Sequence, residues 1–123
     1  MAGTLVANTI NTDTGLFSTN NAYLGMAKAW VNYNQTTRTI ANSFNVSSVT
    51  YNGTGDFSIN FATAMPNANY VAAGMTNINL WVQYGWNGAS GTAPSTTSLR
   101  VQTEAYNAAL YDGITASVVI FGN

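Results

Sequence analysis

The sequence predicts an all-β fold, an antiparallel β-sandwich of about seven strands, preceded by an extended N-terminal arm. Three observations support it: short segments of alternating apolar and polar residues recur after residue 25, clusters of Gly, Asn, Ser, Thr and Pro separate them, and helical periodicity is nearly absent. A chain of 123 residues has the length of one domain. We therefore expect one sandwich at residues 26–123 and an arm at residues 1–25.

A β-hairpin is the strongest local signal. Two strands are predicted at residues 46–51 and 57–61, and the glycine-containing segment between them, residues 52–56 (Asn-Gly-Thr-Gly-Asp), predicts the turn. The oxygens of this turn are of the kind that calcium prefers, but a calcium site takes about six to eight oxygens, several of them from acidic side chains. The single carboxylate here predicts a turn and no metal site.

The same alternation predicts five further strands. They lie at residues 26–33, 70–75, 78–84, 98–104 and 114–121. At residues 26–33, Trp30 falls on one alternating face and Tyr33 on the other, so the side that meets the core stays open. Residues 65–69 predict a turn and residues 85–97 a long exposed loop. In the last strand, one face is expected to hold Ile114, Ala116, Val118 and Ile120.

Charge is scarce in this chain. Three basic and four acidic residues make up 6% of it, where about 25% is typical, and 17 Asn, 17 Thr and 9 Ser supply the polar surface. Lys28, Arg38 and Arg100 form no basic stripe, so nucleic acid is not expected as a partner. No apolar run reaches the length of a signal or transmembrane segment, so we expect neither a membrane partner nor a host secretion route.

The side chains that usually carry catalysis are also scarce. The chain has no Cys and no His, which removes thiolate chemistry and the commonest general base and metal ligand. A glycosidase needs two carboxyl groups across a cleft. The four acids are expected in an arm, a turn, an exposed strand face and a loop: Asp13, Asp56, Glu104 and Asp112. We therefore expect no enzymatic activity and no cofactor.

Large apolar residues are sparse among the Thr, Asn, Gly and Asp of the first 25 positions. Among them are Leu5, Val6, Ile10, Leu16 and Phe17. Burying the first three contributes roughly 5–8 kcal/mol, whereas ordering a backbone costs about 1–2 kcal/mol per residue. Main-chain hydrogen bonds to a sheet edge are needed as well. We expect these five residues to anchor the protein to a partner.

A second group of candidate residues is aromatic. Trp81, Tyr84 and Trp86 lie close together in sequence, and aromatic rings near Asn and Gln are the materials of a sugar-binding face. Core or interface packing of Trp81 is the alternative. Tyr106 and Tyr111, near a predicted turn at residues 106–113, would complete a distal binding face for a host surface glycan.

Four segments together carry a family resemblance. They are residues 28–34 (Lys-Ala-Trp-Val-Asn-Tyr-Asn), 42–50 (Asn-Ser-Phe-Asn-Val-Ser-Ser-Val-Thr), 52–61 (Asn-Gly-Thr-Gly-Asp-Phe-Ser-Ile-Asn-Phe) and 64–70 (Ala-Met-Pro-Asn-Ala-Asn-Tyr). The stretch from residue 28 to about residue 74 resembles a module of small decoration or fibre proteins of tailed bacteriophages, notably cyanophages and other marine phages. The resemblance implies a non-enzymatic subunit on the virion surface and a homotrimer.

Two placements on the virion compete. In the first, the chain is a capsid decoration or cement protein whose arm binds the major capsid protein or another virion protein. In the second, it is a short tail fibre or receptor-binding protein that contacts host surface glycans. The chain has no long shaft repeat and no heptad pattern, which favours decoration. A host lectin is a third reading, which the missing secretion signal disfavours.

Overall fold

The computed structural model describes residues 3, 4, 6, 9–12, 15–77, 81–84 and 92–122. Within them the chain forms ten strands and one helix, and that helix is too short to cross a membrane. In chain order the elements are β1 (Thr9–Thr12), β2 (Gly15–Ser18), α1 (Thr19–Gly25), β3 (Ala27–Asn34), β4 (Thr39–Phe44), β5 (Val46–Gly53), β6 (Asp56–Phe61), β7 (Val71–Thr76), β8 (Trp81–Tyr84), β9 (Ser98–Glu104) and β10 (Thr115–Phe121).

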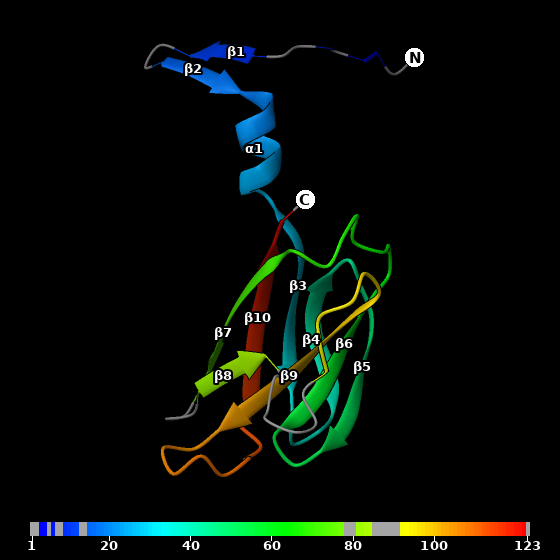
Figure 1. Cartoon of the computed structure of the whole chain (residues 1–123), viewed down its shortest axis with the longest axis vertical. Helices are drawn as coiled ribbons and strands as arrows, with labels where there is room; N and C mark the ends of the chain where they lie inside the picture. The colour runs from blue at the N-terminus through cyan, green and yellow to red at the C-terminus, as the bar shows by residue number, and fades with distance from the viewer. Residues whose placement is uncertain are drawn as a thin grey trace.

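Two four-stranded antiparallel sheets pack face to face. The first sheet has the strand order β4-β3-β10-β7 and the second sheet the order β5-β6-β9-β8, and Figure 1 shows the two as layers of one sandwich. The predicted all-β sandwich is confirmed. The hairpin β5–β6 and the strands β3, β7, β9 and β10 lie within two residues of their predicted bounds.

One strand was not predicted: β4, which adds an eighth strand to the two sheets. β8 confirms residues 81–84 of the predicted strand at residues 78–84, and residues 78–80 lie outside the described part of the chain. Of the predicted loop at residues 85–97, the structure describes residues 92–97, which form no strand or helix.

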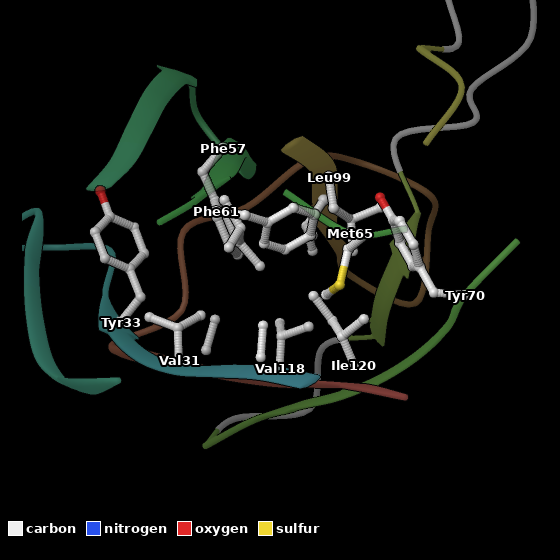
Figure 2. Close-up of a cluster of buried hydrophobic side chains, with 13 residues drawn as sticks. Val31, Tyr33, Phe57, Phe61, Met65, Tyr70, Leu99, Val118 and Ile120 are labelled. Atoms are coloured by element: carbon white, nitrogen blue, oxygen red, sulfur yellow. The ribbon is translucent and has the colours of Figure 1, made fainter. Parts of the chain in front are cut away.

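The core lies between the sheets and takes alternate residues of four central strands. Figure 2 shows Val31, Val118 and Ile120 of the first sheet facing Phe57, Phe61 and Leu99 of the second. The face of β3 that the sequence left open is now assigned, because Tyr33 is buried, with its ring centroid 5.2 Å from that of Phe57. Trp30 therefore points to the outside of the first sheet, since successive side chains of a strand alternate in direction.

Ile114 does not share the strand face on which it was expected. The sequence placed it there with Ala116, Val118 and Ile120, but 54% of its surface is accessible whereas those three residues are buried. The strand begins one residue later, and the carbonyl of Ile114 accepts a hydrogen bond from the backbone N–H of Gln35 at 3.2 Å. Ile114 thus belongs to the loop before β10, while Ala116, Val118 and Ile120 share one face of β10 as predicted, and that face is buried.

A single residue, Asn45, turns the chain from the first sheet into the second. It separates β4 from β5 and has a φ of 53°. Asn tolerates this left-handed conformation better than most residues because its short polar side chain can bond locally. Here its Nδ2 donates to the carbonyls of Lys28 and Thr63, at 3.0 and 3.1 Å. The corner is therefore held by side-chain hydrogen bonds.

Buried polar side chains fasten one end of the sandwich. Gln35 is buried, its Nε2 donates to Thr103 Oγ1 at 2.9 Å and its Oε1 accepts from the N–H of Gly113 at 2.8 Å. Thr103 Oγ1 donates in turn to the carbonyl of Tyr111 at 2.7 Å. The network joins the β3–β4 turn, β9 and the loop before β10. Because each of these buried groups is paired, the hydrogen bonds offset the cost of removing the groups from water.

The first elements of the chain lie at the opposite end. Figure 1 shows β1, β2 and α1 beyond the sandwich, at the end where the C-terminus lies. The pair β1–β2 and the seven-residue helix were not predicted. The Lys28 ammonium lies 3.2 Å from the centroid of the Tyr23 ring and donates to the carbonyl of Tyr23, which links the helix to the start of β3.

Candidate functional site

The outer face of the first sheet carries an apolar surface. The pairing register aligns one row of side chains across all four strands: Phe44, Trp30, Val119 and Ala73. Phe121 and Val71 are paired on one side of this row. On the other side the row runs from Met75 through Ser117 to the polar Asn32 and Asn42. We call this surface the apolar face. Residues directly opposite one another on one face pack together, so these rows form one surface.

Several large side chains of the apolar face are exposed. Met75 is 76% accessible, Val71 64% and Phe44 53%, and Phe121 is exposed as well. Between Trp30 and Met75 the small side chains of Ala73 and Ser117 leave a hollow of about 490 Å³. No residue that lines this hollow carries a titratable side chain. The hollow is therefore suited to binding an apolar group and unsuited to acid–base chemistry.

The outer face of the second sheet is polar, and its side chains bond to one another. Asn60 Nδ2 donates to Ser48 Oγ at 3.0 Å and to Thr50 Oγ1 at 2.9 Å. Asn52 Nδ2 donates to Ser58 Oγ at 2.9 Å and to Asp56 Oδ1 at 3.1 Å. A face of mutually bonded polar groups is well suited to remain in water. The two outer faces of the sandwich therefore differ in kind.

An ion pair on the second sheet, between Arg100 and Asp56, shifts the pKa of both residues. Arg100 Nε donates to Asp56 Oδ1 at 2.8 Å, and its Nη2 also bonds the Asp56 carboxylate. These hydrogen bonds lower the pKa of Asp56, against the opposing effect of burial. They also raise the pKa of Arg100. The pair joins β9, which carries Arg100, to the start of β6 beside the β5–β6 turn, where Asp56 lies.

Two of the four acids meet at the β5–β6 turn. Asp112 Oδ1 accepts from the N–H of Gly55 at 2.6 Å, and Asp112 Oδ2 accepts from the hydroxyl of Tyr51 at 2.9 Å. Asp56 lies at the start of β6 and is bonded to Arg100. Both carboxylates are thus held by internal hydrogen bonds. Among the described residues, no group of three or more His, Cys, Asp or Glu could hold a metal ion.

The structure describes four of the five aromatic residues predicted to form a distal binding face. Tyr106 and Tyr111 lie in the loop between β9 and β10, where they are 88% and 54% accessible. Trp81 and Tyr84 belong to β8 and pair with Glu104 and Val101 of β9. The backbone of Trp81 therefore lies beside the strand end from which that loop departs, whereas Trp86 lies outside the described residues.

The predicted anchoring residues lie in the segment before the sandwich. Val6 is 88% accessible. Ile10 is in β1 and pairs with Phe17 of β2, whose neighbour Leu16 pairs with Asn11. Leu5 lies outside the described residues. The anchoring role of these five residues stays a prediction.

The sequence predictions did not identify the apolar face as a site. Its signal is present in β7 and β10, where both alternating positions are largely apolar: Val71, Ala73 and Met75 face out, as do Val119 and Phe121. Strands that are apolar on both faces are typical of sheets covered on both sides. This pattern could have predicted a second buried surface.

The comparisons with known proteins identify no relative. A scan against protein-family models matches no family, and searches of curated proteins and of solved structures find no match to the chain. A function is therefore inferred from the residues of the chain itself.

Proposed function

We propose that the chain is a non-enzymatic structural subunit of a bacteriophage virion, a capsid decoration or cement protein located at the virion surface. It attaches through residues 1–25 to the major capsid protein or another virion protein, and it assembles as a homotrimer. The resemblance of residues 28–74 to phage decoration and fibre proteins supports the kind of particle. The structure contributes the β-sandwich from which the first 25 residues extend.

One observation carries the assembly role: the apolar face leaves large hydrophobic side chains in water. Contiguous exposed apolar patches on soluble proteins mark interaction sites. Met75 and Val71 are the two most accessible of these side chains, and the residues that line the adjacent hollow are uncharged. In an assembly, such a face would be buried against a neighbouring subunit.

The arrangement of the two ends supports attachment by the arm. β1, β2 and α1 extend from one end of the sandwich, and the loop with Tyr106 and Tyr111 is at the other (Figure 1). A subunit held by its first 25 residues would present that loop away from the particle. The near absence of charge limits steering by long-range electrostatics, so contact surfaces must supply the affinity.

Copy number in purified particles tests the proposal. Quantitative mass spectrometry of virions of the encoding phage should give a count comparable with that of the major capsid protein. A handful of copies per particle would overturn decoration and support a tail appendage. Absence from the particles would overturn both.

Deletion of residues 1–20 tests the anchor. The shortened chain should keep the β-sheet circular dichroism of the full chain and lose binding to particles stripped of the protein. The variant Tyr106→Ser serves as a control at the opposite end and should bind as the full chain does. Binding by the shortened chain would overturn anchoring by the arm.

A short fibre or receptor-binding protein is the second candidate, and the exposure of Tyr106 and Tyr111 favours it. Exposed aromatic rings can stack on sugar rings at the tip of an appendage. In this case Tyr106→Ser should reduce binding of the purified protein to host surface glycans, and Tyr23→Ser at the other end should not. Equal binding by the two variants would overturn the glycan site.

A further inference from the structure

The two outer faces of the sandwich differ in polarity. This difference implies that one face lies in water and the other is covered when the protein functions. On the second sheet the amide groups of Asn60 and Asn52 donate hydrogen bonds to neighbouring side chains, so this polar face is stable when exposed to water. On the first sheet Phe44, Val71 and Met75 are exposed, and Met75 lines a hollow of about 490 Å³. The exposed apolar side chains of the first sheet are unfavourable in water, because exposed apolar area costs free energy in proportion to its extent.

We propose that the apolar face is covered by a second copy of this chain. The proposal specifies a contact surface between copies, and it rests on the proposed function for its biological meaning. In the proposed homotrimer the apolar faces of the three copies meet around the three-fold axis. Three properties of the face support this occupant: its charge, its size and its shape.

The charge of the face suits contact between identical copies. Lys28 is the only charged side chain on the outward positions of the described strands in this sheet, and Tyr23 engages it at the sheet's end. Copies that meet through one face bring like charges together, which opposes association. The uncharged centre of this face removes that opposition. It also offers no charge pattern by which a different protein would be selected.

The size of the face is within reach of a protein contact. Four strands about 4.8 Å apart and six residues long, at about 3.3 Å per residue, give roughly 400 Å² of flat area. The accessible area is larger because protruding side chains roughen the surface. A standard interface buries about 800 Å² of accessible surface on each partner. The apolar face can therefore supply a large part of such a contact.

The shape of the face is complementary to itself. The hollow between Trp30 and Met75 lies beside protruding side chains, among them Phe44 and Val71. A contact in which this face meets the same face of other copies requires the face to carry both the recess and the group that fills it. Buried aromatic and methionine side chains are also the residues that are enriched at the centres of interfaces.

Light scattering coupled to size-exclusion chromatography tests the proposal on the full chain. The wild-type protein should have the mass of two or more copies of the 13.0 kDa chain. Met75→Glu places a carboxylate at the most exposed position of the face and should weaken association by at least about 100-fold. Ser48→Glu adds the same charge to the exposed outer face of the second sheet and should leave the assembly unchanged.

Each outcome decides the matter. A monomeric wild-type protein at tens of micromolar, or an assembly that survives Met75→Glu, overturns the proposal. Because Met75 is exposed, its variant should keep the wild-type circular dichroism; Val71→Glu gives a second test on another strand position if it does not. These measurements use purified protein alone, so they are independent of the copy number in virions that tests the proposed function.

Discussion

Asn45 and Thr63 bond to each other in both directions. The N–H of Thr63 donates to Asn45 Oδ1 at 2.7 Å, and Asn45 Nδ2 donates to the carbonyl of Thr63 at 3.1 Å. This reciprocal pair ties the corner between the two sheets to the segment that leaves β6. The corner thereby connects residues that are 18 positions apart in the chain.

Replacement of Asn45 by Ala should lower the free energy of unfolding by about 2–4 kcal/mol, because Ala loses the hydrogen bonds and also resists the positive φ. Asn45→Gly loses the same bonds without the backbone strain, so it should be about 1 kcal/mol less damaging. Urea denaturation of both variants checks the order. Equal stability of the two would contradict strain at the corner.

Replacement by Ala should be costly at Gly55 and nearly neutral at Gly53. Gly55 has a φ of 63°, and an added Cβ would lie 2.5 Å from the backbone N of Tyr111 and 2.6 Å from the carbonyl O of Thr103. Gly55→Ala should cost about 3–5 kcal/mol, since both neighbours are backbone atoms. Gly53 has open space around its Cα, so Gly53→Ala should change stability by at most about 0.5 kcal/mol. Thermal unfolding of the pair measures the contrast.

Replacement of Tyr33 by Phe is predicted to stabilise the protein. Its hydroxyl is buried and, within the described residues, has no hydrogen-bond partner; burial also raises the pKa of Tyr33. Tyr33→Phe should raise the free energy of unfolding by about 1 kcal/mol, because an unpaired buried hydroxyl is costly.

Tyr70→Phe provides the matched control. The hydroxyl of Tyr70 bonds to the carbonyls of Ser95 and Ser98 at 3.0 and 3.2 Å. Its removal should lower stability by about 1 kcal/mol. A loss of stability in Tyr33→Phe comparable to that in Tyr70→Phe would indicate that the Tyr33 hydroxyl is bonded in solution.

The Asp56–Arg100 pair predicts a pH dependence at the acid end. Because hydrogen bonds from Arg100 lower the pKa of Asp56 in the folded state, the ionised carboxylate stabilises the fold above the unfolded pKa of about 4. That stabilisation is lost as the pH falls through the folded pKa. Asp56→Asn and Arg100→Gln should therefore both show a smaller loss of stability below pH 4 than the wild-type protein. Chemical denaturation at a series of pH values gives the comparison, and three superimposable profiles would contradict it.

The sequence predicted best where the alternation was clean. β6 was assigned correctly because Phe57, Ile59 and Phe61 meet the core at every second position, next to a glycine turn. β4 was missed because a register shift opposite Asn32 and Tyr33 breaks its alternation. Ile40 packs against the core while Phe44 points outward, although the two are four residues apart.

The candidate site was harder to predict than the fold. Trp30 and Tyr33 stand on opposite faces of one strand, and only the second sheet determines which of them is enclosed. The apolar face depends on register across β4, β3, β10 and β7, which are distant in sequence. Alternation within a strand gives two faces, but it does not give the neighbours that turn one face into a surface.

The place of β10 in the first sheet has a consequence for how the protein is made. β10 pairs with β3 on one side and β7 on the other, and it follows both of them in the chain. Until residues 115–121 have emerged from the ribosome, β3 and β7 cannot be joined and their edges remain open to other chains. Such long-range pairing slows folding and exposes unpaired edges while it lasts. The sandwich can therefore complete its fold only after residues 115–121 have been made, and overproduction of chains cut before β10 should yield aggregates.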